Sequence, residues 1–332
     1  MTRSILVQIP VNEVSQFLDK TSRAQLESFG RIIWNPHNRP LTQEELIRYI
    51  PEAHTVVTTW RSAPVTDEVL KHARQLKLIA HMAGAVKPYM TPNIYDRGIR
   101  VLNSGFAIAV SVGESVLAIM LALGHNIVQV DRRMRNGEAW KDASLETFEL
   151  RGKTVGLVGL GMVAREVIKV LQPFQPRLLG YDPYFPADRA AELGVELLPL
   201  AELLSRSDIV SLHAPKIPET YRMIGRRELA LLRDGAMLIN TARGGLIDEE
   251  ALLEQLRTGR IVAGLDVFEK EPLAGDSEFR RLPNVLARPH LAGVNRDSKL
   301  RIGSLLVEEM RSFYEGGTLR FEVMRQQLEL MT

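Results

Sequence analysis

Short apolar runs alternate with amphipathic segments along most of the chain, and this pattern predicts strands separated by helices. The segment after residue 66, for example, carries apolar residues at helical spacing at Val69, Leu70, Ala73 and Leu76. Strands that alternate with helices favour a parallel sheet covered on both faces. The first series of strands is predicted at Ser4–Ile9, Arg31–Trp34, Val56–Thr59, Leu78–Met82 and Arg100–Leu102.

A second series of strands follows, and no internal repeat or low-complexity linker separates it from the first. The two series therefore predict two α/β domains, joined near 103–109 and again near 291–295. A last helix, Asp297–Glu315, would return to the first domain and make it discontinuous. The second series is predicted at Thr154–Val158, Arg177–Tyr181, Ile209–Leu212, Ala236–Asn240, Ile261–Val267 and Val285–Ala287.

Composition narrows the class of protein. The 332 residues are enough for two domains, and 45% hydrophobic with 25% charged residues is typical of a soluble globular protein. The net charge of +2, without a long block of one sign, indicates neither nucleic acid nor an acidic membrane as a partner. The absence of cysteine excludes disulfides and thiolate chemistry and fits a reducing compartment such as the cytoplasm.

Two apolar stretches need an interpretation. The run before Pro10 is too short for a signal peptide and is better read as a first strand. The longer stretch Val110–Val130 is interrupted by Glu114, His125 and Asn126, so we expect a soluble protein with no membrane span.

A glycine motif directly follows the predicted strand Thr154–Val158, in the order Gly159-x-Gly161-x-x-Ala164. In such a motif the first glycine permits a tight turn, the second lets the backbone approach a pyrophosphate, and the third small residue lets helix and strand pack closely. The helix that begins near Met162 and Val163 supplies amide donors and a partial positive charge. The motif predicts a dinucleotide site.

An acidic residue, Asp182, ends the next predicted strand, 18 residues after Ala164. A carboxylate there can accept hydrogen bonds from the ribose hydroxyls and repels a 2′-phosphate, which predicts NAD as cofactor in preference to NADP. The alternative interpretation is that Asp182-Pro183 only begins a turn.

Three later strands of the second series are followed by Arg243, Glu271 and His290. Because ligands bind at the carboxyl ends of such strands, these residues are expected beside the nicotinamide. Histidine is a base near neutral pH, a carboxylate can orient it, and arginine can hold a substrate carboxylate. Oxidation of a 2-hydroxy acid needs a base for the hydroxyl proton and a cation for the carboxylate, and these residue types supply both. Taken singly, Glu271 is better explained as a surface residue, whereas a loop cap for Arg243 and a core histidine for His290 are as good as the functional interpretations.

Together with the glycine motif, these segments resemble the D-isomer-specific 2-hydroxyacid dehydrogenase family over essentially the whole chain. The resemblance is carried by Asn103-Ser104, Glu114, Gly137-x-x-Trp140, the glycine loop, Leu212-His213-Ala214-Pro215 with Thr220, Asn240-Thr241-Ala242-Arg243-Gly244, Asp266-Val267-Phe268-x-x-Glu271-Pro272 and Pro289-His290.

The resemblance implies a Rossmann-type NAD-binding domain, residues 104–291, inserted in a flavodoxin-like substrate domain, residues 1–103 and 292–332, with an active-site cleft between them. It implies an NAD-dependent enzyme that moves a hydride to or from C2 of a small 2-hydroxy or 2-oxo acid. His290 would be the acid/base, Glu271 its partner and Arg243 the carboxylate anchor, with Glu269 a solvent-facing neighbour.

Other residues receive roles from the same resemblance. A homodimer built on the Val110–Val130 helix is implied as well. The residues implied at the cofactor, besides those of the glycine motif, are His213, Ala214, Pro215, Thr220, Thr241, Ala242, Asp266 and Gly293.

The chain departs from the family in the loop after Leu78–Met82, where Ala83-Gly84-Ala85-Val86-Lys87-Pro88 replaces Gly-x-Gly-Val-Asp. The amides of Gly84 and Ala85 can still bind a substrate carboxylate. Lys87 has two interpretations: Pro88 now fixes the next helix start, or the lysine favours a second anionic group on the substrate. Trp60 either lines the substrate pocket or packs between domains.

Two other functions remain open at this point. An NAD-responsive adaptor would need an exposed peptide groove or a long tail, and the chain ends soon after its last helix. Phosphite oxidation is compatible with the three residues, whereas formate enzymes typically carry glutamine in place of Glu271. No metal site is expected, because the 7 histidines show no close paired spacing.

Overall fold

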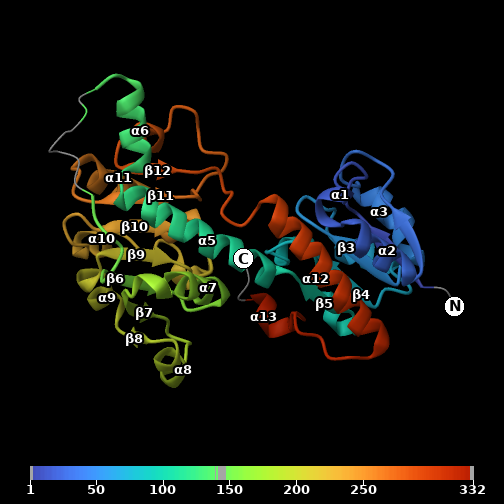
Figure 1. Ribbon diagram of the computed structural model, residues 1–332. Helices are drawn as coiled ribbons and strands as arrows, with labels where there is room; N and C mark the ends of the chain where they lie inside the picture. Colours follow the sequence, from blue (N-terminus) through green and yellow to red (C-terminus); the bar gives the residue numbers. More distant parts are fainter. Residues whose placement is uncertain (1–2, 139, 141–146, 330–332) are drawn as a thin grey trace. The chain divides into compact units, whose positions relative to one another are not determined.

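The computed structural model describes residues 3–138, 140 and 147–329. The chain forms two compact units (Figure 1). The terminal unit comprises Met1–Ile108 and Val294–Thr332, and the central unit comprises Ala109–Gly293. These boundaries lie five and two residues beyond the domain limits predicted from the sequence, at 103/104 and 291/292.

The terminal unit is built on a parallel sheet in the order β2-β1-β3-β4-β5, which is the flavodoxin-like order. Alternate residues of each strand belong to different hydrophobic clusters, as Leu6 does against Ile5 and Val7. The sheet is therefore buried on both faces. Its strands are β1 (Ser4–Val7), β2 (Arg31–Trp34), β3 (Thr55–Thr58), β4 (Leu78–His81) and β5 (Arg100–Asn103).

Helices from both ends of the chain cover this sheet. Phe17 of α1, Leu26 of α2 and Ile302 of α12 share a core with one face, and Leu46 of α3 and Leu328 of α13 share a core with the other. The predicted return of the last long helix to the first sheet is thereby observed. The helices are α1 (Val14–Phe17), α2 (Lys20–Ser28), α3 (Gln43–Tyr49), α4 (Asp67–His72), α12 (Arg296–Glu315) and α13 (Arg325–Glu329).

The central unit contains a parallel sheet in the order β12-β11-β10-β9-β6-β7-β8. Numbered from its own first strand, this is the doubly wound order 3-2-1-4-5-6 with one strand added, and its topological switch point lies between β6 and β9. The strands are β6 (Thr154–Val158), β7 (Arg177–Tyr181), β8 (Val195–Leu197), β9 (Ile209–Leu212), β10 (Met237–Asn240), β11 (Val262–Leu265) and β12 (Val285–Ala287). The three-residue β8 was not predicted from the sequence.

Helices cover this second sheet as well. Leu203 of α9, Leu229 of α10 and Leu252 of α11 pack in one core with strand residues such as Val210. Ile119 of α5 packs against β11. The helices are α5 (Gly105–Gly124), α6 (Ile127–Arg135), α7 (Met162–Leu171), α8 (Ala187–Glu192), α9 (Leu200–Arg206), α10 (Arg226–Leu231) and α11 (Glu249–Arg257).

The apolar stretch expected as one helix over Val110–Val130 is divided. It ends as α5 at Gly124 and resumes as α6 at Ile127, because Asn126 takes a left-handed conformation with φ 50°. By length and composition alone, α5 would suffice to cross a membrane. Of the residues expected to interrupt such a span, only Glu114 lies within α5. The helix also buries Val116 and Met120 in the protein.

Candidate functional site

The glycine loop leaves β6 at the switch point of the central sheet. Gly159 has φ +92°, and a Cβ there would lie 2.8 Å from the Ala214 amide nitrogen, so a side chain is excluded. A Cβ on Gly161, by contrast, would meet nothing within 4 Å. Open space therefore adjoins the first turn of α7, whose N-cap makes no side-chain hydrogen bond. The buried Ala164 lets α7 pack closely on the strand.

Asp182 follows β7 and has a role that sequence reasoning missed. Its carboxylate accepts hydrogen bonds from the amides of Leu160 and Tyr184, each at 2.9 Å. The residue thus ties the glycine loop to the end of β7. The Tyr184 bond closes a turn, so Asp182 does begin a turn as the alternative interpretation expected. Each carboxylate oxygen retains a lone pair for a ribose hydroxyl.

Orphaned polar atoms gather at the same edge of the sheet. Both ring nitrogens of His213 and the hydroxyl of Thr241 are buried and find no hydrogen-bond partner among the described residues. Burial lowers the pKa of His213 to about 3, so its ring is neutral near pH 7. Because buried polar atoms are normally satisfied, these atoms point to a polar ligand. Thr220 differs, since its hydroxyl donates to the Pro215 carbonyl at 2.6 Å within its own turn.

Asp266, directly after β11, organises the loop that carries His290. Its fully buried carboxylate accepts the amides of Leu291 at 3.0 Å and Ala292 at 2.8 Å, and its carbonyl accepts the His290 amide at 2.8 Å. His290 itself has φ +55°, a left-handed conformation that is strained for a residue with a side chain. Three hydrogen bonds to one aspartate hold this conformation.

His290 and Glu271 form a pair. Nδ1 of His290 lies 2.7 Å from Oε2 of Glu271, and the other oxygen of Glu271 accepts the Phe268 amide at 3.0 Å. The pair is partly exposed, with 48% of the histidine and 35% of the glutamate side chain accessible. The carboxylate is held from both sides, while the Nε2 side of the imidazole is the one left to face a reactant. The core interpretation of His290 is therefore wrong, whereas Glu271 is an exposed residue that also holds the histidine.

Arg243 follows β10 and lies near this pair. Burial lowers the pKa of its guanidinium, and the negative charge of Glu271 opposes that effect. Its loop is held by Asn240, whose side chain donates to the Arg243 carbonyl at 2.9 Å and accepts the Ala242 amide at 3.0 Å. A Cβ on Gly244 would lie 1.9 Å from the Phe268 carbonyl carbon. Only glycine therefore allows the arginine loop to contact the glutamate loop.

Glu269, expected as a solvent-facing neighbour, is partly exposed and is also bonded to two other residues. Its side chain is only 27% exposed, accepts a hydrogen bond from the Tyr221 hydroxyl at 2.6 Å and pairs with Arg222 at 3.1 Å. The Glu269 amide donates to Glu249 at 2.7 Å. Burial raises the pKa of Glu249, against the effect of that hydrogen bond. The sequence did not predict these contacts of Glu269, because Tyr221 and Arg222, Glu249 and Glu269 lie on three separate segments.

The remaining predicted residues, Trp60, Gly84 and Ala85, lie in the terminal unit. The Trp60 ring packs 6.1 Å from that of Phe17, on the core of its own unit, and is only partly exposed. Gly84 and Ala85 are partly exposed in the loop after β4. The exposed Lys87 opens a 3-10 turn with Pro88 as its second residue, which agrees with the helix-start interpretation.

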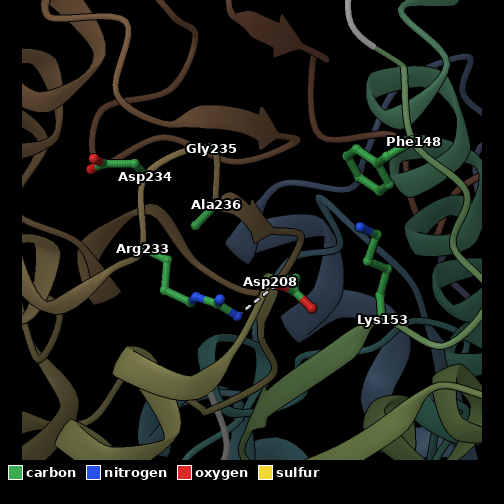
Figure 2. A pocket seen from close by; sticks show the side chains of 7 residues that line it. All are labelled: Phe148, Lys153, Asp208, Arg233, Asp234, Gly235 and Ala236. Atoms are coloured by element: carbon green, nitrogen blue, oxygen red, sulfur yellow. Dashed lines mark hydrogen bonds and ion pairs between the residues drawn. The ribbon is translucent and has the colours of Figure 1, made fainter.

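A surface pocket of about 170 Å³ lies elsewhere on the central unit (Figure 2). Lys153, Asp208 and Ala236, which line it, directly precede β6, β9 and β10, so the pocket is at the amino edge of the sheet, opposite the glycine loop. Figure 2 shows Arg233 paired with Asp208, at 2.8 Å. In the described part of the chain no group of three or more histidine or acidic residues could hold a metal ion.

The strand order, the glycine loop and the open helix N-terminus define the central unit as a dinucleotide-binding domain. Residues 117–292 match the NAD binding domain of the D-isomer specific 2-hydroxyacid dehydrogenases. The chain belongs to this family.

Named relatives agree with this assignment. A hydroxypyruvate reductase of Thermotoga maritima is 38% identical over 276 residues, which are 81% of this chain and 88% of that protein. A D-3-phosphoglycerate dehydrogenase of Archaeoglobus fulgidus is 36% identical over 282 residues, 84% of this chain and 53% of that protein. The chain thus spans about half the length of this relative.

The fold agrees as well. A solved structure of a protein from Thermus thermophilus superposes with a TM-score of 0.78 at 30% identity, covering 97% of this chain and 100% of that one.

Proposed function

We propose that this protein is an NAD-dependent oxidoreductase that transfers a hydride between nicotinamide and C2 of a small 2-hydroxy or 2-oxo acid. The observation that carries the proposal is the His290–Glu271 pair, 2.7 Å apart and close to Arg243, at the carboxyl edge of the NAD-binding sheet. A general acid/base, a charge partner and a carboxylate anchor are the groups that this reaction requires.

Three groups of the chain perform the proton and charge chemistry. Nε2 of His290 donates a proton to the C2 oxygen during reduction and accepts it during oxidation. Glu271 stabilises the imidazolium and fixes the ring through Nδ1. Arg243 binds the substrate carboxylate and polarises the C2 oxygen. NAD(H), when bound, supplies or accepts the hydride.

The central unit fits this cofactor. The open space at Gly161 and the first amides of α7, at Met162 and Val163, suit a pyrophosphate. Asp182 would accept the ribose hydroxyls, which favours NAD over NADP. The remaining cofactor residues proposed, all in loops that follow β9, β10, β11 and β12, are His213, Ala214, Pro215, Thr220, Thr241, Ala242, Asp266 and Gly293.

The terminal unit would contribute to substrate binding through the amides of Gly84 and Ala85, with Trp60 limiting the shape of the side chain accepted. Lys87, exposed in the same loop, would favour a substrate that has a second anionic group.

The test is NADH consumption by the purified protein with glyoxylate, hydroxypyruvate, pyruvate, branched and aromatic 2-oxo acids and a dicarboxylate. Turnover that disappears in His290→Ala supports the proposal, and preference for the dicarboxylate supports the role of Lys87. Failure of the whole panel while NADH still binds would contradict it and favour an NAD-responsive adaptor.

We also infer a cytoplasmic homodimer. Its basis is an exposed apolar surface on and after α6, where Ile127 is 54%, Val128 60%, Met134 44% and Trp140 80% accessible. Surfaces of this kind are typical of subunit interfaces. Light scattering coupled to gel filtration tests the dimer, and Val128→Lys should shift it towards a monomer.

A further inference from the structure

The loop after β4 exposes two backbone amides in a fixed orientation. Among the described residues, neither Gly84 nor Ala85 donates its amide to another group of the protein, and both residues are partly exposed. The carbonyls of the same two peptide groups accept hydrogen bonds from the side chains of Ser104 and Asn103. Ser104 Oγ donates to the Ala83 carbonyl at 3.0 Å, and Asn103 Nδ2 donates to the Gly84 carbonyl at 2.5 Å.

Because the peptide group is planar, these two hydrogen bonds also fix the directions of the two amides. In a planar trans peptide, the C=O of one residue and the N–H of the next point in opposite directions. Anchoring the Ala83 carbonyl therefore directs the Gly84 amide away from Ser104, and anchoring the Gly84 carbonyl directs the Ala85 amide away from Asn103. Both amides are presented on the side opposite the two anchors, as in backbone nests that bind anions.

Asparagine is the side chain that this position needs. Its Oδ1 accepts the Gly105 amide at 2.5 Å while its Nδ2 donates to the Gly84 carbonyl. One partner only donates and the other only accepts, so the side-chain amide has a single consistent orientation. An aspartate of the same shape would accept from Gly105 and repel the Gly84 carbonyl. Asn103 and Ser104 are also buried, at 5% and 3% exposure, so water does not compete with these bonds.

We propose that Asn103 and Ser104 are positioning residues that aim the amides of Gly84 and Ala85 at the substrate carboxylate. This inference rests on the proposed 2-oxo acid activity. It assigns to Asn103 and Ser104 control of substrate affinity, separate from the proton transfer at His290.

The test compares Asn103→Asp and Ser104→Ala with wild type, and Asn35→Asp is the matched control. Asn35 is a buried asparagine of the same unit whose side chain donates to the carbonyls of Gln8 and Arg39, at 3.1 and 2.9 Å. It follows β2, at the opposite edge of the sheet from β5. A general loss of packing would affect both asparagine variants equally.

We expect Asn103→Asp to raise KM for the 2-oxo acid about 10-fold or more, with kcat and NADH affinity changing much less. Ser104→Ala should raise KM about threefold, because it loses one neutral hydrogen bond. Asn35→Asp should lose thermal stability without a change in KM. An unchanged KM in Asn103→Asp, or an equal KM rise in Asn35→Asp, would overturn the inference.

A second measurement does not depend on turnover. Oxalate added to 15N-labelled protein with NADH should shift the amide resonances of Gly84 and Ala85, and Asn103→Asp should weaken this binding by the same factor as it raises KM. If wild type reduces no 2-oxo acid, the proposed function fails, and the oxalate titration alone still decides the orientation of the amides. No shift of these two resonances in wild type would refute the positioning role.

Discussion

The carboxyl edges of the two sheets present their chemistry in different ways. At the central sheet, the groups proposed to react are side chains: Arg243, Glu271 and His290 come from three different loops, with Asn240 holding the arginine loop and Asp266 the histidine loop. At the terminal sheet, the proposed donors are the backbone amides of Gly84 and Ala85, and the side chains of Asn103 and Ser104 hold the carbonyls of the same peptides. Proton transfer needs groups with a suitable pKa, whereas carboxylate binding needs only oriented donors.

Under this proposal the loop can carry the changes seen here and still present its amides. Replacing the outer glycines by Ala83 and Ala85 leaves the amides in place, because neither residue has a positive φ. At the central edge, Gly244 has no such freedom, since its missing side chain is what allows contact with the Phe268–Glu269 peptide. Substitution is therefore easier where the backbone supplies the donors and its conformation does not require glycine.

The largest effect is expected from His290→Ala. Loss of the general acid/base should lower kcat/KM about 1,000-fold, while NADH affinity, measured by fluorescence, remains within about twofold of wild type. The exposed His125 of the same unit provides the control, as His125→Ala should retain full activity. A His290→Ala variant with wild-type rate would show that the central edge does not supply the proton.

Glu271→Gln should have the next largest effect, a fall in kcat of about 100-fold. Glutamine keeps the size of the side chain but has a single oxygen, so it can still accept from the Phe268 amide while it presents an uncharged NH2 group to Nδ1 of His290. Steady-state kinetics with Glu250→Gln, which changes an exposed acid on α11, gives the comparison. Equal activity of the two variants would mean that a charged acceptor at Nδ1 of His290 is not needed for the reaction.

The stability of the terminal unit should depend on pH through the protonation of His81. Burial lowers the pKa of this histidine from 6.5 to about 3, with its ring bonded to Thr58. As pH falls below 6.5 the unfolded chain binds a proton that the folded one does not, so stability is lost between pH 6.5 and 3. At pH 5 the loss is about 2 kcal/mol.

Urea unfolding at pH 7 and pH 5 measures this effect, with His81→Gln as the variant. The difference in unfolding free energy between the two pH values should be smaller in His81→Gln by that amount. The same pH dependence in both proteins would show that His81 is protonated in the folded state.

The smallest effect is expected from Asp182→Asn, which sharpens the comparison because Asp182 holds backbone amides and is also proposed to bind the cofactor. The side-chain oxygen of asparagine can keep one of the two amide bonds. Removing the charge should raise the ratio of NADPH to NADH efficiency about 10-fold. An unchanged ratio, from kcat/KM with each cofactor, would assign Asp182 to the turn alone.

The sequence by itself determined the alternation of strands and helices, the two series of strands, the glycine motif and the identity of the polar residues that follow β10, β11 and β12. These features are local: a buried strand needs a run of apolar residues, and a tight turn needs glycine at a fixed spacing. Short elements such as β8 were not predicted, because three residues are too few to show a periodic pattern of apolar positions. The helix break at Asn126 was not predicted, because a single residue in the left-handed conformation does not change the pattern of apolar and polar positions.

Only the tertiary structure decided which atoms face one another. The 2.7 Å pair of His290 with Glu271, the bonds of Glu269 to Tyr221 and Arg222, and the anchoring of the 83–85 loop by Asn103 and Ser104 join segments distant in sequence. A hydrogen bond depends on distances of tenths of an ångström, and such distances are set by packing of whole sheets and helices. The sequence therefore identifies the chemistry, and the fold determines which groups can perform it.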